Sequence, residues 1–127
     1  MTATTTDIPY NVARNYFVNN DIAQLPQTPI TTEGEFDVFF GKAPVMGKGG
    51  LPTPIDFSKS YVLAVDVPDT SYATQIIPVS LVRDSSGKIV YSYKVETGRE
   101  LGFEIHPCLI LIVPKQYGTQ VEFRRLQ

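Results

Sequence analysis

Residues 72–95 read YATQIIPVSLVRDSSGKIVYSYKV, and this stretch decides the fold class. Two runs rich in β-branched and aromatic residues flank a DSSG turn at 84–87, and apolar residues recur at every second position within each run. The apolar residues that share a face are Ile77, Val79 and Leu81 in the first run and Ile89, Tyr91, Tyr93 and Val95 in the second. Pro78 has no N–H to donate to a neighbouring strand, so it predicts a bulge or an edge. The whole pattern predicts a β-hairpin.

Further strands are expected on both sides of this hairpin. SYVLAVDV (60–67) is apolar almost throughout, which is typical of a central strand with two covered faces. After a second turn at ETGRE (96–100), residues 101–114 form one strand or two that meet at Pro107. TQVEFRR (119–125) alternates apolar and charged residues and closes the chain as a last strand. The C-terminal half is therefore predicted to be an antiparallel meander.

Residues 33–40 have the convincing helical pattern of this chain. Thr32 and Glu35 fit a capping box, in which the two side chains bond otherwise unpaired backbone N–H groups. The phenylalanines that follow at i, i+3 and i+4 spacing on one face are Phe36, Phe39 and Phe40. Gly41 stands where a left-handed residue commonly ends a helix. We expect a short helix whose phenylalanines pack onto a sheet.

The predicted fold class is mostly β, a β-dominated α+β fold. We expect an antiparallel sandwich or partly open barrel of about six or seven strands, with one short helix near 33–40 and a short edge strand at 16–20. The chain has 127 residues, of which 43% are hydrophobic and 19% charged, as in one ordinary globular domain. The polar start MTATTTDIP predicts a flexible leader over 1–9, so a single β-rich domain would span 10–127.

Charge and hydropathy exclude two classes of partner. The formal net charge is −2, and Lys and Arg are scattered singly, so no basic stripe is predicted to bind nucleic acid. The longest apolar run, CLILIV (108–113), is far shorter than the roughly 20 residues of a membrane-spanning helix. No secretory signal opens the chain, but a mature exported protein would begin in the same way. A single cysteine leaves the redox compartment open.

Patterns for catalysis, nucleotide binding and metal binding are weak. GKAPVMGKG (41–49) departs from the phosphate-binding loop G-x-x-x-x-G-K-[ST] in its spacing and in its last position. His106 and Cys108 lie two apart on one strand, about 7 Å at roughly 3.3 Å per residue, which is too far for easy proton transfer. We expect Cys108 to be buried and His106 to lie near a strand end. One His and one Cys do not complete a zinc site, so no catalytic residue, metal or cofactor is predicted.

The stretch GKAPVMGKGGLPTPIDF (41–57) is the candidate site. Its glycines permit close approach, and its prolines hold the second half extended, so it is either a connector or a recognition loop. The candidate partner-binding residues are Met46, Lys48, Gly49, Gly50, Leu51, Pro52 and Thr53. Asp56 and Phe57 are expected to anchor the loop, with the Asp56 carboxylate bonding backbone N–H groups.

The order of several motifs resembles the C-terminal domain of the PrcB-like protease-complex-subunit family. The motifs are EFDVFFG (35–41), PIDFSKSYVLAV (54–65), HPCLILIVPK (106–115) and a last strand VEF (121–123). The resemblance covers about residues 33–123 and implies a small exported or surface-associated β domain that accompanies a protease. It implies no catalytic residue. The long GKAPVMGKGGLPT segment departs from the family pattern and leaves the partner-binding mode open.

These observations leave several functions to compare. The leading prediction is a non-enzymatic, exported (periplasmic or cell-surface) interaction domain with a protein partner, possibly a protease. The runner-up is a proteinase inhibitor that places the extended loop 46–54 in a protease cleft. An enzyme acting through Cys108 or a pair of carboxylates ranks below both. A carbohydrate-binding module ranks lowest, because no Trp is present to stack on a sugar ring. The oligomeric state is open.

Overall fold

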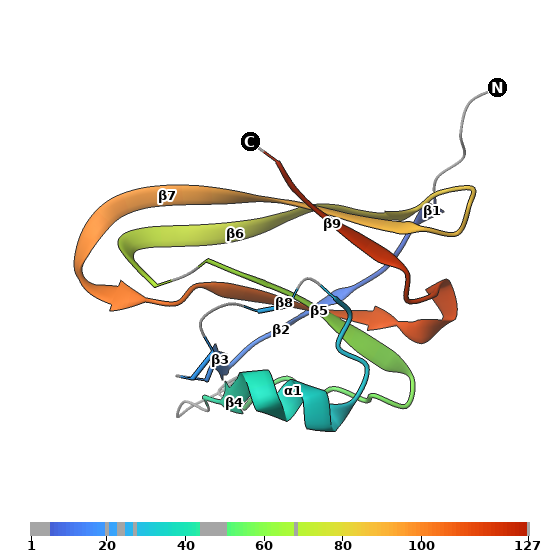
Figure 1. Cartoon of the computed structure of the whole chain (residues 1–127), viewed down its shortest axis with the longest axis horizontal. Coiled ribbons are helices and arrows are strands. Elements are labelled where there is room, and N and C mark those ends of the chain that lie inside the picture. The colour runs from blue at the N-terminus through green and yellow to red at the C-terminus, as the bar shows by residue number, and fades with distance from the viewer. Residues whose placement is uncertain are drawn as a thin grey trace.

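The computed structural model describes residues 6–19, 21–22, 25–26, 28–43, 51–67 and 69–126. Within these residues lie nine strands, one α-helix and one 3₁₀ helix (Figure 1). The strands are β1 (Thr6–Asp7), β2 (Asn11–Ala13), β3 (Tyr16–Val18), β4 (Phe40–Lys42), β5 (Ser60–Asp66), β6 (Thr70–Arg83), β7 (Ile89–Ile105), β8 (Cys108–Pro114) and β9 (Val121–Leu126). The helices are α1 (Glu33–Phe39) and the 3₁₀ turn η1 (Lys115–Tyr117). The mostly-β fold class with one short helix is confirmed.

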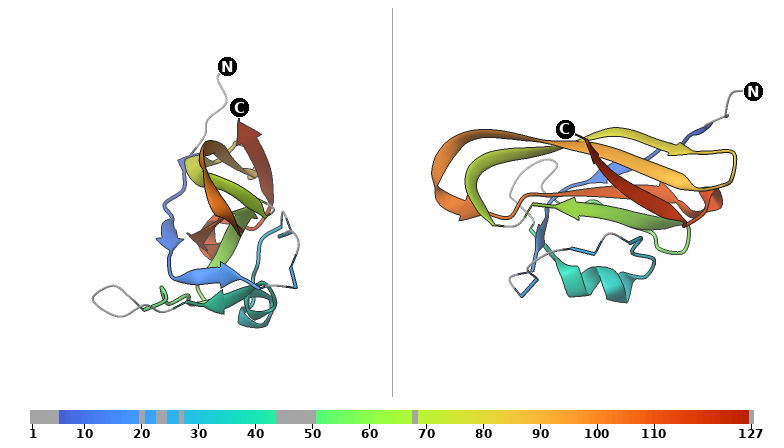
Figure 2. Two further views of the ribbon diagram at one scale, coloured as in Figure 1. Left: turned by 90° about the vertical axis from the view of Figure 1, so that its left-hand side faces the viewer. Right: turned by 45° about the horizontal axis from the view of Figure 1, so that its top comes forward.

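The strands and the helix form three layers (Figures 1 and 2). One layer is the sheet β1-β6-β7-β9, the middle layer is the sheet β2-β8-β5, and α1 lies on the far side of the middle sheet with the β3–β4 pair. Within the described residues, the sheets stay open and do not close into a barrel.

The middle sheet separates two hydrophobic cores. Tyr61, Leu63 and Val65 of β5 face the first core, toward β6 and β7, while Val62 and Ala64 face the second core, toward α1. Neighbouring β8 alternates in the same way: Leu111 and Val113 belong to the first core, and Ile110 and Ile112 to the second. Because both faces are covered, both strands read as continuous apolar runs. This explains why the sequence of β5 is typical of a central strand.

The predicted hairpin is the pair β6–β7, but one face of β6 differs from the prediction. Ile89, Tyr91, Tyr93 and Val95 all face the first core as expected. In β6 the register shifts between Pro78 and Ser80, which is the bulge that Pro78 predicts. One extra residue reverses the alternation, so Ile76 and Leu81 are buried while Val79 is 48% exposed. The predicted shared face of Ile77, Val79 and Leu81 is therefore wrong.

The C-terminal half departs from a simple antiparallel meander. No turn interrupts β7 at 96–100, and the strand continues to Ile105. The chain leaves this sheet at His106 and Pro107, and β8 then pairs with β5 in the middle sheet. Strand β9 returns to β7 and pairs with it in parallel. Since Pro107 cannot donate a ladder hydrogen bond, it is a natural point for the chain to change sheets.

Helix α1 begins as predicted but ends differently. Thr32 accepts a hydrogen bond from the Glu35 N–H, and Phe36 packs into the second core. The helix ends at Phe39, because Phe40 is extended and begins β4. Gly41 does not adopt the left-handed conformation predicted for it; instead it pairs with Phe17 of β3, whose ring occupies the space of a Cβ atom. Glycine is needed at position 41 because a side chain there would collide with the Phe17 ring.

Residues 6–8, which were predicted to belong to a flexible leader over 1–9, are part of the fold. Thr6 and Asp7 pair with β6, and the Ile8 side chain is buried in the first core. Residues 1–5 lie outside the described part of the chain. Within the described part, no helix combines the length and the apolar character needed to cross a membrane.

Candidate functional site

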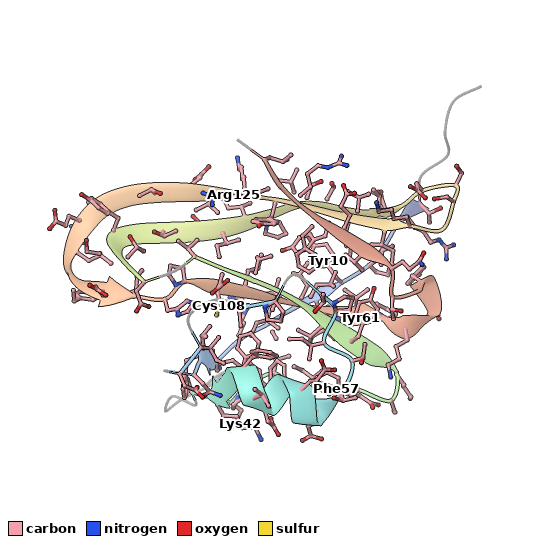
Figure 3. The ribbon with its side chains drawn as sticks, viewed as in Figure 1. Tyr10, Lys42, Phe57, Tyr61, Cys108 and Arg125 are labelled. Carbon is pink, nitrogen blue, oxygen red and sulfur yellow. The ribbon has the colours of Figure 1, made fainter. Side chains whose placement is uncertain are left out.

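A pocket of about 410 Å³ lies between α1 and the segment 51–57. Aromatic, aliphatic and proline side chains line most of it: Tyr16, Phe36, Leu51, Pro52, Pro54, Ile55 and Phe57. Its charged lining residues are Glu33, Asp37 and Lys42. Figure 3 shows Phe57 and Lys42 beside α1. Concave apolar sites with a few polar groups are the usual form of binding sites in proteins.

Phe36 forms the aromatic base of this pocket. Its ring contacts Tyr16 edge-on, with centroids 5.1 Å apart, and stacks on Phe40 at 4.8 Å. On the side of the candidate loop, Phe57 lies against it at 5.8 Å in a tilted arrangement. Phe36 is buried, because α1 turns this face toward the middle sheet. The helix thus supplies a fixed aromatic surface to a pocket that remains open to solvent.

The wall of the pocket opposite α1 is the second half of the candidate loop, and hydrogen bonds hold it to the β2–β3 connection. The Thr53 N–H donates to the Arg14 carbonyl at 3.1 Å, and the Arg14 N–H donates to Thr53 Oγ1 at 2.9 Å. The Tyr16 hydroxyl donates to the Thr53 carbonyl at 2.6 Å. Asn15 Nδ2 donates to the Leu51 carbonyl at 2.9 Å. Residues 51–53 are therefore anchored to a part of the chain that is distant in sequence.

Asn15 makes this anchoring possible through its backbone. It is the one non-glycine residue with a positive φ, 66°, within the described chain. Asparagine tolerates this left-handed conformation better than most residues. The conformation reverses the chain between β2 and β3, and the Asn15 carbonyl also accepts from the Ala43 N–H at 2.8 Å. Asn15 thus forms hydrogen bonds with two residues of the candidate loop, Ala43 and Leu51.

The predicted partner-binding residues divide into three groups. Met46, Lys48, Gly49 and Gly50 lie outside the described residues. Leu51 is 80% exposed at the rim, and Pro52 lines the pocket. The backbone of Thr53 is bonded to the chain's own Arg14 and Tyr16.

The two predicted anchors have separate roles. Phe57 packs against Phe36 and joins the loop to the second core. Asp56 bonds the turn that follows it, because its Oδ1 accepts from the Ser58 N–H at 3.0 Å and from the Ser58 hydroxyl. These hydrogen bonds lower the pKa of the Asp56 carboxyl. Asp56 therefore starts the turn into β5, and within the described residues its carboxylate makes no hydrogen bond to the preceding loop.

The electrostatics of the pocket are dominated by its acidic side. Glu33 and Asp37 are one helical turn apart on α1, and both side chains are exposed. The pKa of Tyr16 is raised, first by burial of its hydroxyl and then by the negative charges of Asp37 and Glu33. Both carboxylates are therefore close enough to the Tyr16 hydroxyl to disfavour its negatively charged form. Lys42, from β4, is the basic group in the lining.

A second polar cluster holds the other end of β5 and involves His106. His106 Nε2 lies 2.6 Å from Asp66 Oδ2, and its Nδ1 lies 3.4 Å from Asp69 Oδ1. The Leu25 N–H donates to both oxygens of Asp66 at 3.2 Å. Asp66 is only 4% exposed, so these donors replace the water it loses. We call this group of contacts the Asp66–His106 clasp.

Cys108 lies next to the clasp but is not activated by it. Asp66 is its partner in the β5–β8 ladder, and both ring nitrogens of His106 face carboxylates. Burial, and to a smaller degree the charge of Asp66, raises the pKa of the Cys108 thiol to about 11. A thiol with this pKa is protonated at neutral pH and is a poor nucleophile.

Sequence reasoning missed most of the pocket. Tyr16, Phe36 and Lys42 come from three different elements, and none of them has a motif that signals binding. Glu33 and Asp37 could have been found as a pair of carboxylates at i, i+4 on the exposed face of the predicted helix. Asp66 and His106 are 40 residues apart, and only the β5–β8 pairing brings them together.

A search for metal-ligand groups in the described part of the chain and comparisons with known proteins found no match. Among the described residues, no three His, Cys, Asp or Glu side chains are grouped so that they could hold a metal ion. No protein-family model, curated protein or solved structure matches this chain.

Proposed function

We propose that this protein is a non-enzymatic, exported interaction domain, an accessory subunit of a protease complex, and that it binds its partner at the pocket between α1 and residues 51–57. The observation that carries the proposal is the pocket itself, an open apolar hollow of about 410 Å³ with an anchored wall. The sequence resemblance to an accessory protease-subunit family supports the choice of a protease as the partner.

The anchored wall favours recognition over a simple connection. A connector needs only to span a distance, but residues 51–53 are bonded to Arg14, Asn15 and Tyr16 across 36 to 39 residues of chain. A surface that is ordered before it meets a partner loses less conformational entropy on binding. Leu51, 80% exposed at the edge of this ordered segment, is suited to be a contact residue.

A proteinase inhibitor is the second candidate, and it rests on a different feature of the same segment. Residues 51–54 carry Pro52 and Pro54, which favour an extended chain, and present Leu51 to solvent. An inhibitor of this kind would insert the segment into a protease cleft and stop turnover. An accessory subunit would use the pocket and leave turnover intact.

Affinity capture combined with protease assays tests the proposal. Wild-type chain is immobilised beside Pro54→Arg, which places a long side chain over the pocket from an exposed position, and Val79→Arg, a matched change at an exposed position on β6. Extracts of the cells that produce the protein are passed over all three, and the eluates are assayed for protease identity and activity. Thermal unfolding of each variant checks that it is folded.

We expect wild type and Val79→Arg to retain an active protease and Pro54→Arg to retain at least about tenfold less of it. A protease that loses activity in proportion to added chain would instead support the inhibitor. If Pro54→Arg captures the same protease as well as wild type does, the pocket is not the binding site and the proposal is wrong.

A further inference from the structure

Resting on the proposed function, we infer that the pocket recognises an extended peptide segment with an apolar side chain next to a basic one. The apolar side chain would enter the pocket beside Leu51, Pro54 and Phe57, and the Lys or Arg would meet Glu33 and Asp37. The partner is thus identified by its chemistry, a short apolar-basic segment of a protein.

The apolar half of this inference follows from the lining. Phe36 and Phe57 pack against each other at this end of the pocket, with ring centroids 5.8 Å apart, and the prolines in the lining have no N–H groups to donate to a ligand. Grooves lined by aromatic side chains commonly bind extended peptides, because such peptides are already close to the bound conformation. An aliphatic or aromatic side chain gains most from this surface because its burial removes apolar area from water.

The basic half follows from the placement of charge. Glu33 and Asp37 both line the pocket, and both act on the Tyr16 hydroxyl at its edge. No hydrogen bond or ion pair within the described residues joins either carboxylate group to a basic side chain. A ligand cation would therefore find two carboxylates one helical turn apart. Such rim charges contribute modestly to affinity but strongly to the choice of partner.

Lys42 would donate hydrogen bonds to the backbone of the bound peptide. It lies in β4, on an element different from the two acidic residues, and lines the same pocket. An extended peptide exposes carbonyl groups that an ammonium group can bond.

A displayed library of random dodecapeptides tests the inference. It is selected in parallel on wild type, on the double variant Glu33→Lys/Asp37→Lys, on Pro54→Arg, and on Glu100→Lys/Glu104→Lys. The last variant makes the same charge change at exposed positions of β7. Enriched peptides are then synthesised with a fluorophore, and their affinities are measured by anisotropy at two salt concentrations. For each peptide, matched forms carry Glu in place of the basic residue or Ser in place of the apolar one.

On wild type and on the β7 variant, we expect peptides with an apolar residue beside Lys or Arg. Glu33→Lys/Asp37→Lys should weaken their binding about five- to tenfold and should select acidic residues instead. Enriched peptides that require the pocket but show no basic preference would overturn this inference and leave the proposed function standing. If nothing is enriched on wild type beyond what Pro54→Arg selects, both the inference and the binding role of the pocket fail.

Discussion

The two cores of this protein lie on opposite faces of one sheet and are held in different ways. The first core, between the β6–β7 hairpin and the middle sheet, is built from strand pairing and fully buried side chains such as Leu63, Tyr91 and Leu111. The second core, between the middle sheet and α1, is edged by hydrogen bonds from side chains to backbone that join Tyr16 and Asn15 to residues 51–53. The pocket of about 410 Å³ borders the second core, where Phe36 and Phe57 belong to both.

Under the proposed function, this difference separates the part of the molecule that stabilises the fold from the part that binds a partner. A close-packed core has no room for a ligand, because a void there costs contacts on every side. Directional hydrogen bonds can hold an extended segment beside a hollow without filling it. The middle sheet therefore has a stabilising face toward the hairpin and a face that supports the candidate site.

The largest test of this comparison sets Leu111→Ala against Leu51→Ala. Leu111 is fully buried in the first core, so truncation should lower the free energy of unfolding by about 2–5 kcal/mol. Leu51 is 80% exposed at the pocket rim, so the same change should alter stability by less than about 0.5 kcal/mol. Urea unfolding followed by circular dichroism measures both. Similar losses in the two variants would show that the pocket rim is part of the stabilising structure.

A somewhat smaller effect is expected at the Asp66–His106 clasp, which ties the Leu25 segment and the β7–β8 connection to the end of β5. His106→Ala leaves the nearly buried Asp66 carboxylate without its 2.6 Å partner and should cost about 3 kcal/mol in urea unfolding. Asp69→Asn is the control, because Asp69 is 65% exposed and 3.4 Å from the ring. Equal effects of the two changes would mean that the buried contact has no special weight.

The smallest change in stability is expected when a tyrosine hydroxyl is removed, and its sign should depend on whether that hydroxyl is hydrogen-bonded. The hydroxyl of Tyr61 is buried in the first core with no partner within the described residues, whereas the Tyr16 hydroxyl donates to Thr53. Tyr61→Phe should therefore leave stability at neutral pH unchanged or raise it by about 1 kcal/mol, while Tyr16→Phe should lower it by about 1 kcal/mol. Thermal unfolding of both variants measures the sign, and a loss in Tyr61→Phe would show that its hydroxyl is bonded after all.

The pH dependence sharpens the same test. Burial raises the pKa of Tyr61 from 10.0 to about 12. Because the pKa of Tyr61 is higher in the folded state, the unfolded chain loses this proton first as the pH rises. The free energy of unfolding is therefore unaffected by this group below pH 10 and falls by about 2–3 kcal/mol as the pH rises toward 12. Wild type should lose stability over this range more steeply than Tyr61→Phe. Burial also raises the pKa of Tyr91, which is present in both proteins and affects both stability curves equally. If the curves of wild type and Tyr61→Phe are parallel above pH 10, the raised pKa does not belong to Tyr61.

How far the sequence predicts this molecule can be seen residue by residue. Strand β5 was readable as a central strand because both of its faces are covered, and the core face of β7 was readable because burial on one side produces a period-two pattern. The Pro78 bulge was also predictable, but its effect on Val79 was not, since one inserted residue reverses every side chain beyond it. The continuation of β7 through residues 96–100 was missed because turn-forming residues there are accommodated by pairing with β6.

The candidate site was predicted in outline only. The loop 41–57 was identified from its glycines and prolines, and Leu51 and Pro52 do lie at the pocket. The opposite wall comes from Glu33, Phe36 and Tyr16, which the sequence marks only as a helix start, a core residue and an edge-strand residue. Local patterns describe how each segment folds, and they do not say which segments meet.

The sequence by itself determined the fold class, the capped helix at Thr32 and the central strand β5, because these depend on hydrophobic periodicity and on contacts within a few residues. Only the tertiary structure decided that residues 51–53 bond to Arg14 and Tyr16, that Asp66 meets His106, and that β9 runs parallel to β7. Each of these arrangements joins groups at least 32 residues apart in the chain. Their free energy is gained only after the sheets have brought those groups together, so no local pattern in the sequence records them.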